Sequence, residues 1–372
     1  MPDPIPGPCR ATATIAFARV ADYLEPILAS IATHDMRITP EGASWRVEAV
    51  FGRAWLQPQP GALTLRVETA DAVSLNRMKH ALAGPIGFIA ASEKLEIRWV
   101  GDAAGLVPLD DLRVLRVVQV SALTPRLRRI VLQGEDLGHL DRPDQMHCRL
   151  IFAARGEAAP VWPMLDDDGR VAWPGGKMPT RVYTLRAVDP ARGQVTIDFA
   201  LHAAAGPATA WAEAACPGDA VAVVGPAAGG PIAASFHVLF GDETGLPGIA
   251  RMLESLAPDA RGHAFIEVQD EGEILALSAP PGIALQWLLR GAAPAGTTTL
   301  LQQAVRGVAW PRALAEVFVW GGCEYRAFRD IHRFLKQEVG LDRARQVLYS
   351  HWHRTLSEEQ IIEIGGAAYL PE

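Results

Sequence analysis

Apolar residues in the first hundred positions recur at two different spacings, and each spacing predicts a different kind of element. Alternating or β-prone stretches predict short strands, at residues 11–17, 45–51, 63–67 and 95–100. Apolar residues three and four positions apart predict amphipathic helices, at residues 20–31 and 72–89. Together these elements predict a compact α+β unit whose last strand closes the sheet. No recognisable catalytic motif falls in this stretch.

The pattern changes after a linker at residues 101–109, which contains Gly105 and Pro108. Short apolar runs are then separated by Gly, Pro and Asp, a rhythm that is typical of antiparallel barrels. The strands predicted from these runs are residues 114–120, 127–132, 149–152, 182–187, 195–202 and 220–224. A helix is predicted among them at residues 207–214.

From residue 237 the pattern becomes an alternation of strands and helices. The predicted strands are 237–240, 263–268, 317–320 and 347–351, and the predicted helices are 246–256, 298–308 and 325–339. Such alternation implies a parallel sheet with helices on both faces. We therefore predict three domains, an N-terminal α+β domain (1–103), an antiparallel β-barrel (110–232) and a C-terminal α/β domain (233–372). A barrel followed by a doubly wound domain is a flavin-plus-nicotinamide layout.

The composition is that of a folded soluble protein, with 49% hydrophobic and 21% charged residues in 372. The formal net charge of −7 gives the whole chain no electrostatic reason to bind nucleic acid or an anionic membrane. No basic stretch followed by an apolar run begins the chain, and no window offers about 18 uninterrupted apolar residues, so we expect a cytoplasmic protein. The four cysteines lie far apart and indicate reduced thiols, at Cys9, Cys148, Cys216 and Cys323.

The strand predicted around residue 182 carries the strongest candidate site, Arg181-Val182-Tyr183-Thr184. Side chains alternate along a strand, so Arg181 and Tyr183 share one face and Thr184 points to the other. An Arg can fork two hydrogen bonds to a phosphate, and an aromatic ring can cover a flat isoalloxazine. A Thr hydroxyl can bond near the reactive nitrogen. The same pattern also suits an ordinary edge strand with a solvated Arg.

Gly206-Pro207-Ala208-Thr209 opens the helix predicted within the barrel. Pro207 suits the first helical turn, and small residues let backbone amides approach a ligand. Because helix N-termini favour anions, this turn is a candidate seat for a pyrophosphate. The same residues would also serve helix capping alone.

An ordered series of motifs extends over residues 110–360. It begins with Thr-Pro-Arg-Leu-Arg-Arg at 124–129, Arg-Val-Tyr-Thr-Leu-Arg at 181–186, Asp-Phe-Ala-Leu-His at 198–202 and Gly-Pro-Ala-Thr-Ala-Trp at 206–211. It continues with Gly-Asp at 218–219, Gly-Pro at 225–226, Gly-Asp-Glu-Thr-Gly-Leu-Pro at 241–247 and Glu324 before a long helix. The series resembles the siderophore-interacting protein family of FAD-dependent ferric-siderophore reductases.

The resemblance implies a multidomain fold in which an FAD-binding barrel precedes a nicotinamide-binding-like domain, a ferredoxin reductase-like arrangement. It implies that the R-x-Y-T strand and the turn after the next strand hold FAD. The cofactor-binding residues carried over are Arg181, Tyr183, Thr184, Arg186, His202, Gly206, Ala208, Thr209 and Trp211. A nicotinamide nucleotide, NADPH or NADH, is implied beside Asp242, Glu243, Thr244 and Glu324. The G-x-G-x-x-G dinucleotide motif is absent, and the two acidic residues at 242–243 also suit capping of the next helix.

The resemblance further implies basic residues at the exposed edge of the flavin, where they attract an anionic ferric siderophore. The substrate-binding residues carried over are Arg149, His353 and Arg354. The chain departs from the family at this edge, because Arg149 stands where Lys is common, Ala227 where a basic residue is frequent, and His353 where Trp is usual. These changes leave the identity of the substrate open.

Two further side-chain arrangements suggest chemistry that we do not favour. His351 and His353 form an H-x-H pair, but no Cys or third His occurs at a ligand spacing, so we predict no metal site. Cys323 beside Glu324 could be read as a nucleophile. Family members have Gly, Ala or Cys there, so a small packed residue is the better interpretation.

The activity implied by the resemblance is reduction of a ferric siderophore through FAD, with electrons from NAD(P)H or a ferredoxin. No catalytic side chain is expected, because the flavin carries the chemistry. Two alternatives stay open: a flavin-linked reductase whose acceptor is quinone, haem or a protein, and a module that binds flavin or an iron chelate without turnover. Residues 10–100 resemble a small uncharacterised domain found alone or fused to this family, and no role follows for it.

Overall fold

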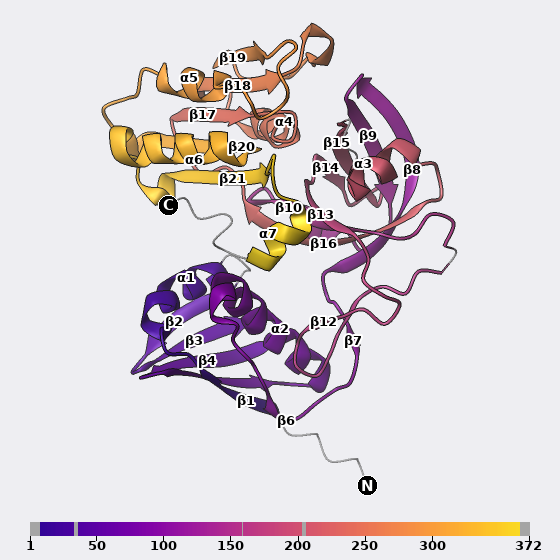
Figure 1. The fold of residues 1–372 in the computed structure, drawn as a ribbon, viewed down its shortest axis with the longest axis vertical. Helices are drawn as coiled ribbons and strands as arrows, with labels where there is room; N and C mark the ends of the chain where they lie inside the picture. Colours follow the sequence, from indigo (N-terminus) through magenta and orange to yellow (C-terminus); the bar gives the residue numbers. More distant parts are fainter. Residues whose placement is uncertain (1–7, 33–35, 158, 203–205, 365–372) are drawn as a thin grey trace. The chain divides into compact units, whose positions relative to one another are not determined.

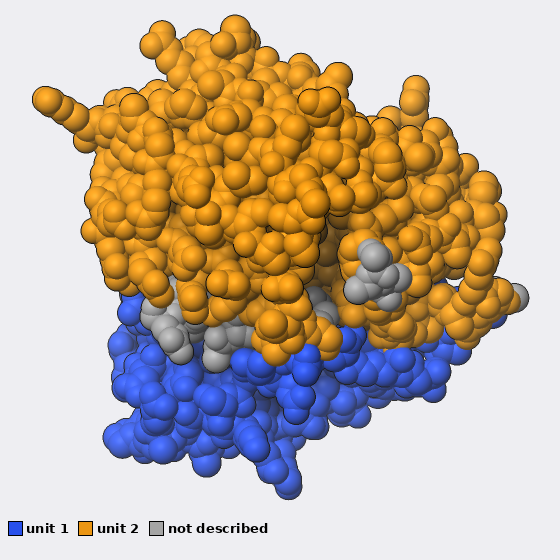
Figure 2. Space-filling model, turned by 45° about the horizontal axis from the view of Figure 1, so that its top comes forward, with its two compact units in different colours: residues 1–112, 158–177, 359–370 blue, residues 113–157, 178–358, 371–372 orange. Residues whose placement is uncertain are grey.

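The computed structural model describes residues 8–32, 36–157, 159–202 and 206–364. The chain divides into two compact units, which are coloured separately in Figure 2 and traced as a ribbon in Figure 1. The first unit contains residues 1–112, 158–177 and 359–370, and the second contains residues 113–157, 178–358 and 371–372. None of the described helices is long and apolar enough to cross a membrane.

The first unit is built on a six-stranded sheet in the order β2-β3-β4-β5-β1-β6, with antiparallel pairings. Its strands are β1 (Cys9–Ala16), β2 (Arg37–Glu41), β3 (Ser44–Ala49), β4 (Gly52–Gln59), β5 (Ala62–Thr69) and β6 (Val100–Gly101). Alternate residues of β1, β4 and β5 are apolar and buried. The buried face packs against α1 (Val20–Ala32) and α2 (Ala72–Ile89), which also contact each other (Figure 1).

Most elements predicted for this unit are confirmed, but the closing strand at 95–100 is wrong for most of its length. Only Val100 and Gly101 pair with β1. Ile97 is buried as the alternation predicts, yet its carbonyl oxygen accepts a hydrogen bond from Arg170 instead of a neighbouring strand. Strands β2 and β4 escape prediction because Pro interrupts the apolar pattern in both.

Residues 158–177 interrupt the barrel sequence but belong to the first unit. They contribute β11 (Met164–Leu165) and β12 (Val171–Ala172) to a three-stranded sheet with β7 (Val107–Pro108). Leu165 is buried. The linker before the barrel and this insertion therefore form one structure, which the sequence pattern does not predict.

A buried lysine of α2 ties the insertion to the N-terminal residues. Lys79 is 1% exposed, and its Nζ donates hydrogen bonds to the carbonyl oxygens of Asp102 and Asp167 at 3.0 and 2.8 Å. His80 Nδ1 lies 2.8 Å from the carbonyl oxygen of Gly169. Burial lowers the pKa of Lys79, and the two carbonyl oxygens compensate part of the lost hydration.

The first half of the second unit is a seven-stranded antiparallel sheet in the order β13-β10-β16-β8-β9-β15-β14. Its strands are β8 (Leu112–Thr124), β9 (Leu127–Gln133), β10 (Gln145–Phe152), β13 (Thr180–Thr184), β14 (Ala187–Asp189), β15 (Gln194–Ala200) and β16 (Ala220–Gly229). Helix α3 (Pro207–Ala214) has the bounds that the pattern predicts and buries Ala208 and Ala212 in the core of this sheet. The predicted antiparallel barrel architecture is confirmed.

The second half of this unit is a five-stranded parallel sheet in the order β19-β18-β17-β20-β21. Its strands are β17 (Phe236–Gly241), β18 (Arg261–Val268), β19 (Gly282–Leu289), β20 (Val317–Glu324) and β21 (Gln346–Trp352). Helix α4 (Leu246–Ser255) packs on one face, and α5 (Leu300–Arg306) and α6 (Tyr325–Phe334) pack on the other. The predicted parallel sheet with helices on both faces is confirmed, although β19 was not predicted. A short helix, α7 (Glu358–Ile364), follows β21 in the sequence, and from residue 359 it belongs to the first unit.

Apolar packing and Arg251 contribute to the joint between the barrel and the parallel sheet within the second unit. Leu127 and Met146 of the barrel share an apolar cluster with residues of α4 and β20. Arg251 of α4 donates hydrogen bonds to the carbonyl oxygens of Leu185 and Arg142, both at 2.7 Å. The residue that follows β13 is therefore fixed directly to a helix of the parallel sheet.

Replacement of Gly169 tests how the insertion packs on α2. Gly169 has φ +72°, and a Cβ there would lie 2.4 Å from the backbone nitrogen of His80. We expect Gly169→Ala to lose about 1–2 kcal/mol through its left-handed backbone and about 1–3 kcal/mol more because the insertion must shift. Gly105→Ala is the matched control, since Gly105 has φ +71° but nothing within 4 Å of its Cβ. Thermal unfolding followed by circular dichroism compares them, and equal losses would contradict the packing.

Candidate functional site

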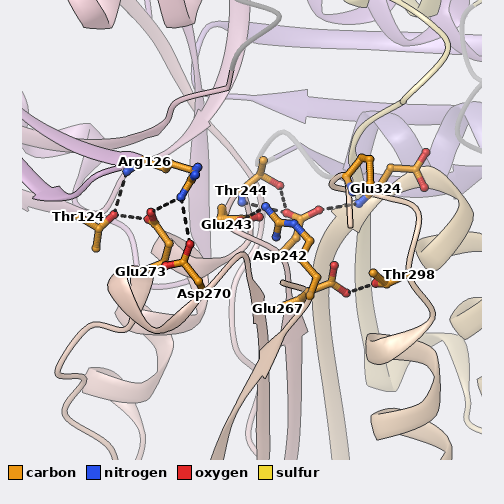
Figure 3. A network of polar contacts seen from close by, with 12 residues as sticks. Thr124, Arg126, Asp242, Glu243, Thr244, Glu267, Asp270, Glu273, Thr298 and Glu324 are labelled. Carbon is orange, nitrogen blue, oxygen red and sulfur yellow. Dashed lines mark hydrogen bonds and ion pairs between the residues drawn. The ribbon is translucent and has the colours of Figure 1, made fainter. Parts of the chain in front are cut away.

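The carboxylate of Asp242 is the centre of a hydrogen-bond network at the carboxyl end of the parallel sheet (Figure 3). Asp242 directly follows β17 and is 5% exposed. Its Oδ1 accepts hydrogen bonds from the N–H and the hydroxyl of Thr244. Its Oδ2 accepts from the N–H of Glu324 at 3.0 Å and from the indole of Trp352 at 2.8 Å. One carboxylate thus connects the carboxyl ends of β17, β20 and β21.

Glu324 is the last residue of β20 and is 3% exposed. Its carboxylate caps α6 by accepting the N–H of Arg326 at 2.6 Å, and it also accepts the N–H of Arg354 at 3.2 Å. The hydroxyl of Thr244 lies 3.2 Å from Nδ1 of His351. Three of the four residues predicted to contact a nicotinamide nucleotide, at 242, 244 and 324, are therefore part of one network.

Glu243, the fourth of these residues, makes a separate ion pair with Arg290, which follows β19. The two side chains are 13% and 5% exposed. Burial raises the pKa of Glu243, and Arg290 acts against that shift. Nε and Nη1 of Arg290 have no hydrogen-bond partner among the residues that the structure describes. A nucleotide contact by Glu243 stays a prediction.

A pocket opens beside the Asp242 network, and Glu267 of β18 lines it together with Thr298 and Cys323. Glu267 is 5% exposed and accepts a hydrogen bond from the hydroxyl of Thr298 at 2.8 Å. Burial raises the pKa of Glu267, and the nearby charge of Asp242 acts in the same direction. Burial also raises the pKa of the Cys323 thiol well above its ordinary value, as expected for a packed residue.

A second polar cluster in Figure 3 links the barrel to the parallel sheet. Glu273 is 2% exposed and accepts hydrogen bonds from the hydroxyl of Thr124 and from the guanidinium of Arg126, the latter at 3.0 Å. Asp270 lies 3.6 Å from the same guanidinium. Thr124 and Arg126, at the beginning of the 124–129 motif, therefore help to hold the barrel and the parallel sheet together.

The remaining arginines of that motif stabilise the barrel itself. Arg128 donates to the carbonyl oxygens of Ala212 and Glu213 at 3.0 and 2.6 Å, where α3 ends and its last carbonyl groups lack helical partners. Arg129 makes a bidentate pair with the buried Asp198 at 2.7 and 2.8 Å. The motif is thus explained by structure without a ligand.

The strand β13 presents Arg181 and Tyr183 as the sequence predicts. The ring of Tyr183 packs against Phe199, with the ring centroids 4.5 Å apart, and stays partly exposed. Arg181 is half-buried, and its Nη1 donates to the carbonyl oxygen of Thr180 at 2.7 Å. A guanidinium and a partly exposed aromatic face thus lie on one strand.

The start of α3 has the features of an anion seat. Gly206 is the N-cap and makes no side-chain capping bond, and Pro207 follows at the first turn. A Cβ on Gly206 would meet nothing within 4 Å, so its backbone is open on that side. The buried Thr209 has its hydroxyl 3.1 Å from Nε2 of His202, which is exposed. These residues lie together as predicted.

Arg186 and Trp211 have structural partners in the second unit. Arg186 makes a bidentate ion pair with Glu254 of α4, and its Nε lies 3.9 Å from Asp198. The ring of Trp211 packs 5.8 Å from that of Phe199. A phosphate contact by Arg186 stays a prediction and would require the guanidinium to leave Glu254.

The three residues predicted to bind substrate come from β10 and from the segment after β21. Arg149 is half-buried and donates to the hydroxyl of Thr180 at 2.9 Å. The ring of His353 stacks on Tyr325 with the centroids 4.1 Å apart. Arg354 is exposed. Their roles toward a substrate stay predictions.

His147 lies opposite Thr184 in the β10–β13 pairing and is 4% exposed. Its ring lies 4.9 Å from that of Tyr349, 5.4 Å from that of His351 and 6.4 Å from that of Trp320. Neither ring nitrogen has a hydrogen-bond partner within the described part of the chain. Burial, and secondarily the charge of His351, lowers the pKa of His147 to about 3, so the ring is neutral at physiological pH.

The donor set of the barrel fits FAD. The guanidinium of Arg181 and the N-terminus of α3 can meet the two negative charges of a pyrophosphate. The partly exposed ring of Tyr183 can cover an isoalloxazine. Guanidinium, backbone donors and an aromatic surface are the groups that this cofactor needs.

Several residues of the site were not predicted from the sequence. His351 was considered only as part of an H-x-H metal pair with His353, and Trp352 between them was given no role, yet both belong to the Asp242 network. Glu267 is the penultimate residue of β18 and Arg290 directly follows β19, and neither strand carries a motif. A signal existed for Glu267, because an acidic residue about 20 positions after the turn of a strand–helix–strand unit is a known feature of nucleotide-binding sheets.

Family comparisons cover almost the whole chain. Residues 12–100 match a family described as uncharacterized proteins conserved in bacteria. Residues 116–230 match the siderophore-interacting FAD-binding domain, and residues 234–355 match the siderophore-interacting protein family. The predicted resemblance is confirmed in both of its parts.

Individual proteins agree with these matches. A siderophore utilization protein from T. fusca is 38% identical, and its crystal structure covers 68% of this chain and 97% of its own with a TM-score of 0.60. The NADPH-dependent ferric-chelate reductase of Escherichia coli is 31% identical over 251 residues, 65% of this chain and 92% of that protein. The ferric vibriobactin reductase ViuB of Vibrio cholerae is 26% identical over 250 residues, 66% of this chain and 91% of that protein.

Replacement of His147 by Phe is expected to make the protein less sensitive to acid. Below the ordinary His pKa of about 6.5, the unfolded chain binds a proton at this position, whereas the folded protein does not until about pH 3. The contribution of His147 to stability is therefore fully present above pH 6.5 and is lost as the pH falls below that value. For each pH unit, the equilibrium constant for folding decreases by up to about tenfold. Phe retains the ring contacts and removes this loss. Unfolding of both proteins between pH 7 and 4.5 measures the slopes, and equal slopes would contradict a neutral buried ring.

Proposed function

The chain belongs to the siderophore-interacting protein family, and we propose that it is an FAD-dependent ferric-siderophore reductase with NADPH or NADH as the electron donor. The observation that supports the proposal is the R-x-Y-T strand together with α3, since Tyr183 of the strand and Trp211 of the helix both pack against Phe199. Two relatives are named as ferric reductases. Reduction releases iron, because ferrous iron is bound less tightly by hard oxygen ligands.

In this proposal the barrel residues hold and orient FAD. Arg181 and the backbone of Gly206, Ala208 and Thr209 bind the pyrophosphate, since both supply donors for negative charge. Tyr183 covers one face of the isoalloxazine, and Thr184 bonds near its edge. His202 and Trp211 border the same region, and Arg186 contributes only if its pair with Glu254 opens.

Bound FAD would supply the chemistry, because a flavin can accept two electrons as one hydride and donate them one at a time to ferric chelates. The protein therefore needs no proton-transferring triad. Its residues position the two reactants and set the local charge. Arg149, His353 and Arg354 provide positive or polar groups toward an anionic chelate.

We further propose that the nicotinamide nucleotide binds at the carboxyl end of the parallel sheet, beside Asp242, Thr244 and Glu324. Open α/β sheets bind ligands at this end, where the strand order reverses. In this sheet the reversal falls between β17, which Asp242 directly follows, and β20, whose last residue is Glu324. A ferredoxin is the alternative donor, and a cytoplasmic location is part of the proposal.

The proposal that Arg181 holds FAD can be tested by its removal. Arg181→Ala is expected to weaken FAD binding on the order of tenfold to hundredfold, because a charge-assisted contact is worth about 1.5–3 kcal/mol. Arg192→Ala is the control, since it removes the same charge from an exposed turn of the barrel at a side chain 77% exposed. Flavin absorbance after dialysis, and titration of the stripped proteins with FAD, give the affinities. Equal FAD retention in both variants would refute the assignment.

The ferric acceptor is tested by rapid mixing without oxygen. The flavin of the wild-type protein is reduced with dithionite and mixed with ferric hydroxamate and ferric catecholate siderophores. We expect flavin reoxidation together with the appearance of ferrous iron, trapped by ferrozine. Reoxidation by quinone or haem alone would favour a different reductase, and a flavin that neither NADPH, NADH nor reduced ferredoxin bleaches would favour a binding module.

A further inference from the structure

The pocket beside Asp242 is lined by more carboxylates than cations. Asp242, Glu267 and Glu324 come from the ends of β17, β18 and β20, and Asp330 comes from α6. Arg326 is the one cation among its lining residues. The other lining groups include the hydroxyl of Thr298. Such a surface accepts hydroxyl donors and repels phosphate.

Glu267 differs from the other two strand-end carboxylates in having an unused oxygen. Both oxygens of Asp242 and of Glu324 accept hydrogen bonds from the protein. Glu267 uses Oε2 for Thr298, as Figure 3 shows, while Oε1 has no hydrogen-bond partner among the described residues. A side chain that is 95% buried, lines a pocket and keeps a free acceptor is suited to a ligand donor.

The position of Glu267 in the fold identifies the donor. Glu267 is the penultimate residue of the second strand of the β17–α4–β18 unit. Near the end of this strand, an acidic residue of nucleotide-binding sheets accepts a hydrogen bond from the 2′-hydroxyl of the adenosine ribose. NADPH carries a phosphate at that position. A phosphate near pH 7 adds about −1.5 to −2 charges and would face a carboxylate already surrounded by others.

We propose that Glu267 binds the unphosphorylated adenosine ribose and makes this chain select NADH over NADPH. The inference rests on the proposed function and specifies its electron donor. It separates the chain from the Escherichia coli relative, whose name states NADPH dependence.

The two nearby arginines do not supply a site for the 2′-phosphate. Arg326 stands at the start of α6 and is exposed, a position suited to the pyrophosphate that NADH and NADPH share. Arg290 is not among the residues that line the pocket, and its charge is matched by Glu243. If an arginine bound the 2′-phosphate, its removal would weaken the binding of NADPH but not that of NADH. This outcome distinguishes such a site from the one that we propose.

The test measures binding without electron transfer, using the FAD-loaded full chain. ADP-ribose and 2′-phospho-ADP-ribose lack nicotinamide and serve as probes in isothermal titration calorimetry. We expect the wild type to bind ADP-ribose at least about tenfold more tightly than 2′-phospho-ADP-ribose, because contact between the 2′-phosphate and the carboxylate of Glu267 is a costly contact of like charges. Glu267→Gln, which keeps the shape and removes the charge, should reduce the ratio to within about threefold, mainly through tighter binding of the phosphorylated probe.

Two control variants separate the alternatives. Glu271→Gln removes an exposed carboxylate of the same domain outside the pocket and should leave the ratio unchanged. Arg326→Ala should weaken both probes by similar factors. A wild type that prefers the phosphorylated probe, a selective loss of that probe in Arg326→Ala, or an unchanged ratio in Glu267→Gln would overturn the inference. Failure of either probe to bind would overturn it too, while iron-dependent flavin reoxidation in the mixing experiment would leave the proposed function standing.

Discussion

The carboxylate of Asp242 is the contact on which the candidate nucleotide site depends. A buried carboxylate is costly unless hydrogen bonds replace its hydration, and here two backbone N–H groups, a hydroxyl and an indole do so. No cation is needed, so the charge remains in the pocket. The same four bonds fix the ends of β17, β20 and β21 against one another, and Glu324 and Thr244 take their positions from them. Asp242 therefore organises the site, and its saturated oxygens leave ligand recognition to neighbours.

A second constraint is the joint between the barrel and the parallel sheet. Glu273 is held by Thr124 and Arg126, and Arg251 binds the carbonyl oxygen directly after β13. In both contacts a side chain of the parallel-sheet half binds a group of the barrel. Glu273 is buried and Arg251 is half-buried. The end of β13 and the parallel sheet are thus joined by direct contacts within one compact unit, and the proposed electron transfer between two bound ligands would depend on this joint.

How much the sequence could predict depended on whether a feature was local. The helices at 72–89 and 207–214 have the predicted bounds because periodicity and caps are written in adjacent residues. The insertion at 158–177 could not be assigned, since the buried Lys79 that anchors it is distant in sequence and lies on a helix whose pattern reads as ordinary. In the site, the Asp-Glu-Thr turn was recognised, but the partnership with Trp352 and the acidic neighbour Glu267 depend on strand order. Arg186 illustrates the reverse difference: its motif predicts a phosphate contact, but in the fold its guanidinium pairs with Glu254.

Charged side chains within the second unit are distributed so that the sites proposed for its ligands differ in the sign of their charge. Carboxylates are gathered at the ends of β17, β18 and β20, while Arg149 and Arg181 lie on the adjacent barrel strands β10 and β13. Under the proposed function, an anionic ferric chelate would be attracted to the arginines and repelled by the carboxylates, and the carboxylates would accept a ribose with free hydroxyls but not a phosphate. Repulsion at the acidic pocket therefore contributes to specificity as much as attraction at the arginines. With a net charge of −7 over the whole chain, the placement of these charges, and not their sum, determines which ligand binds where.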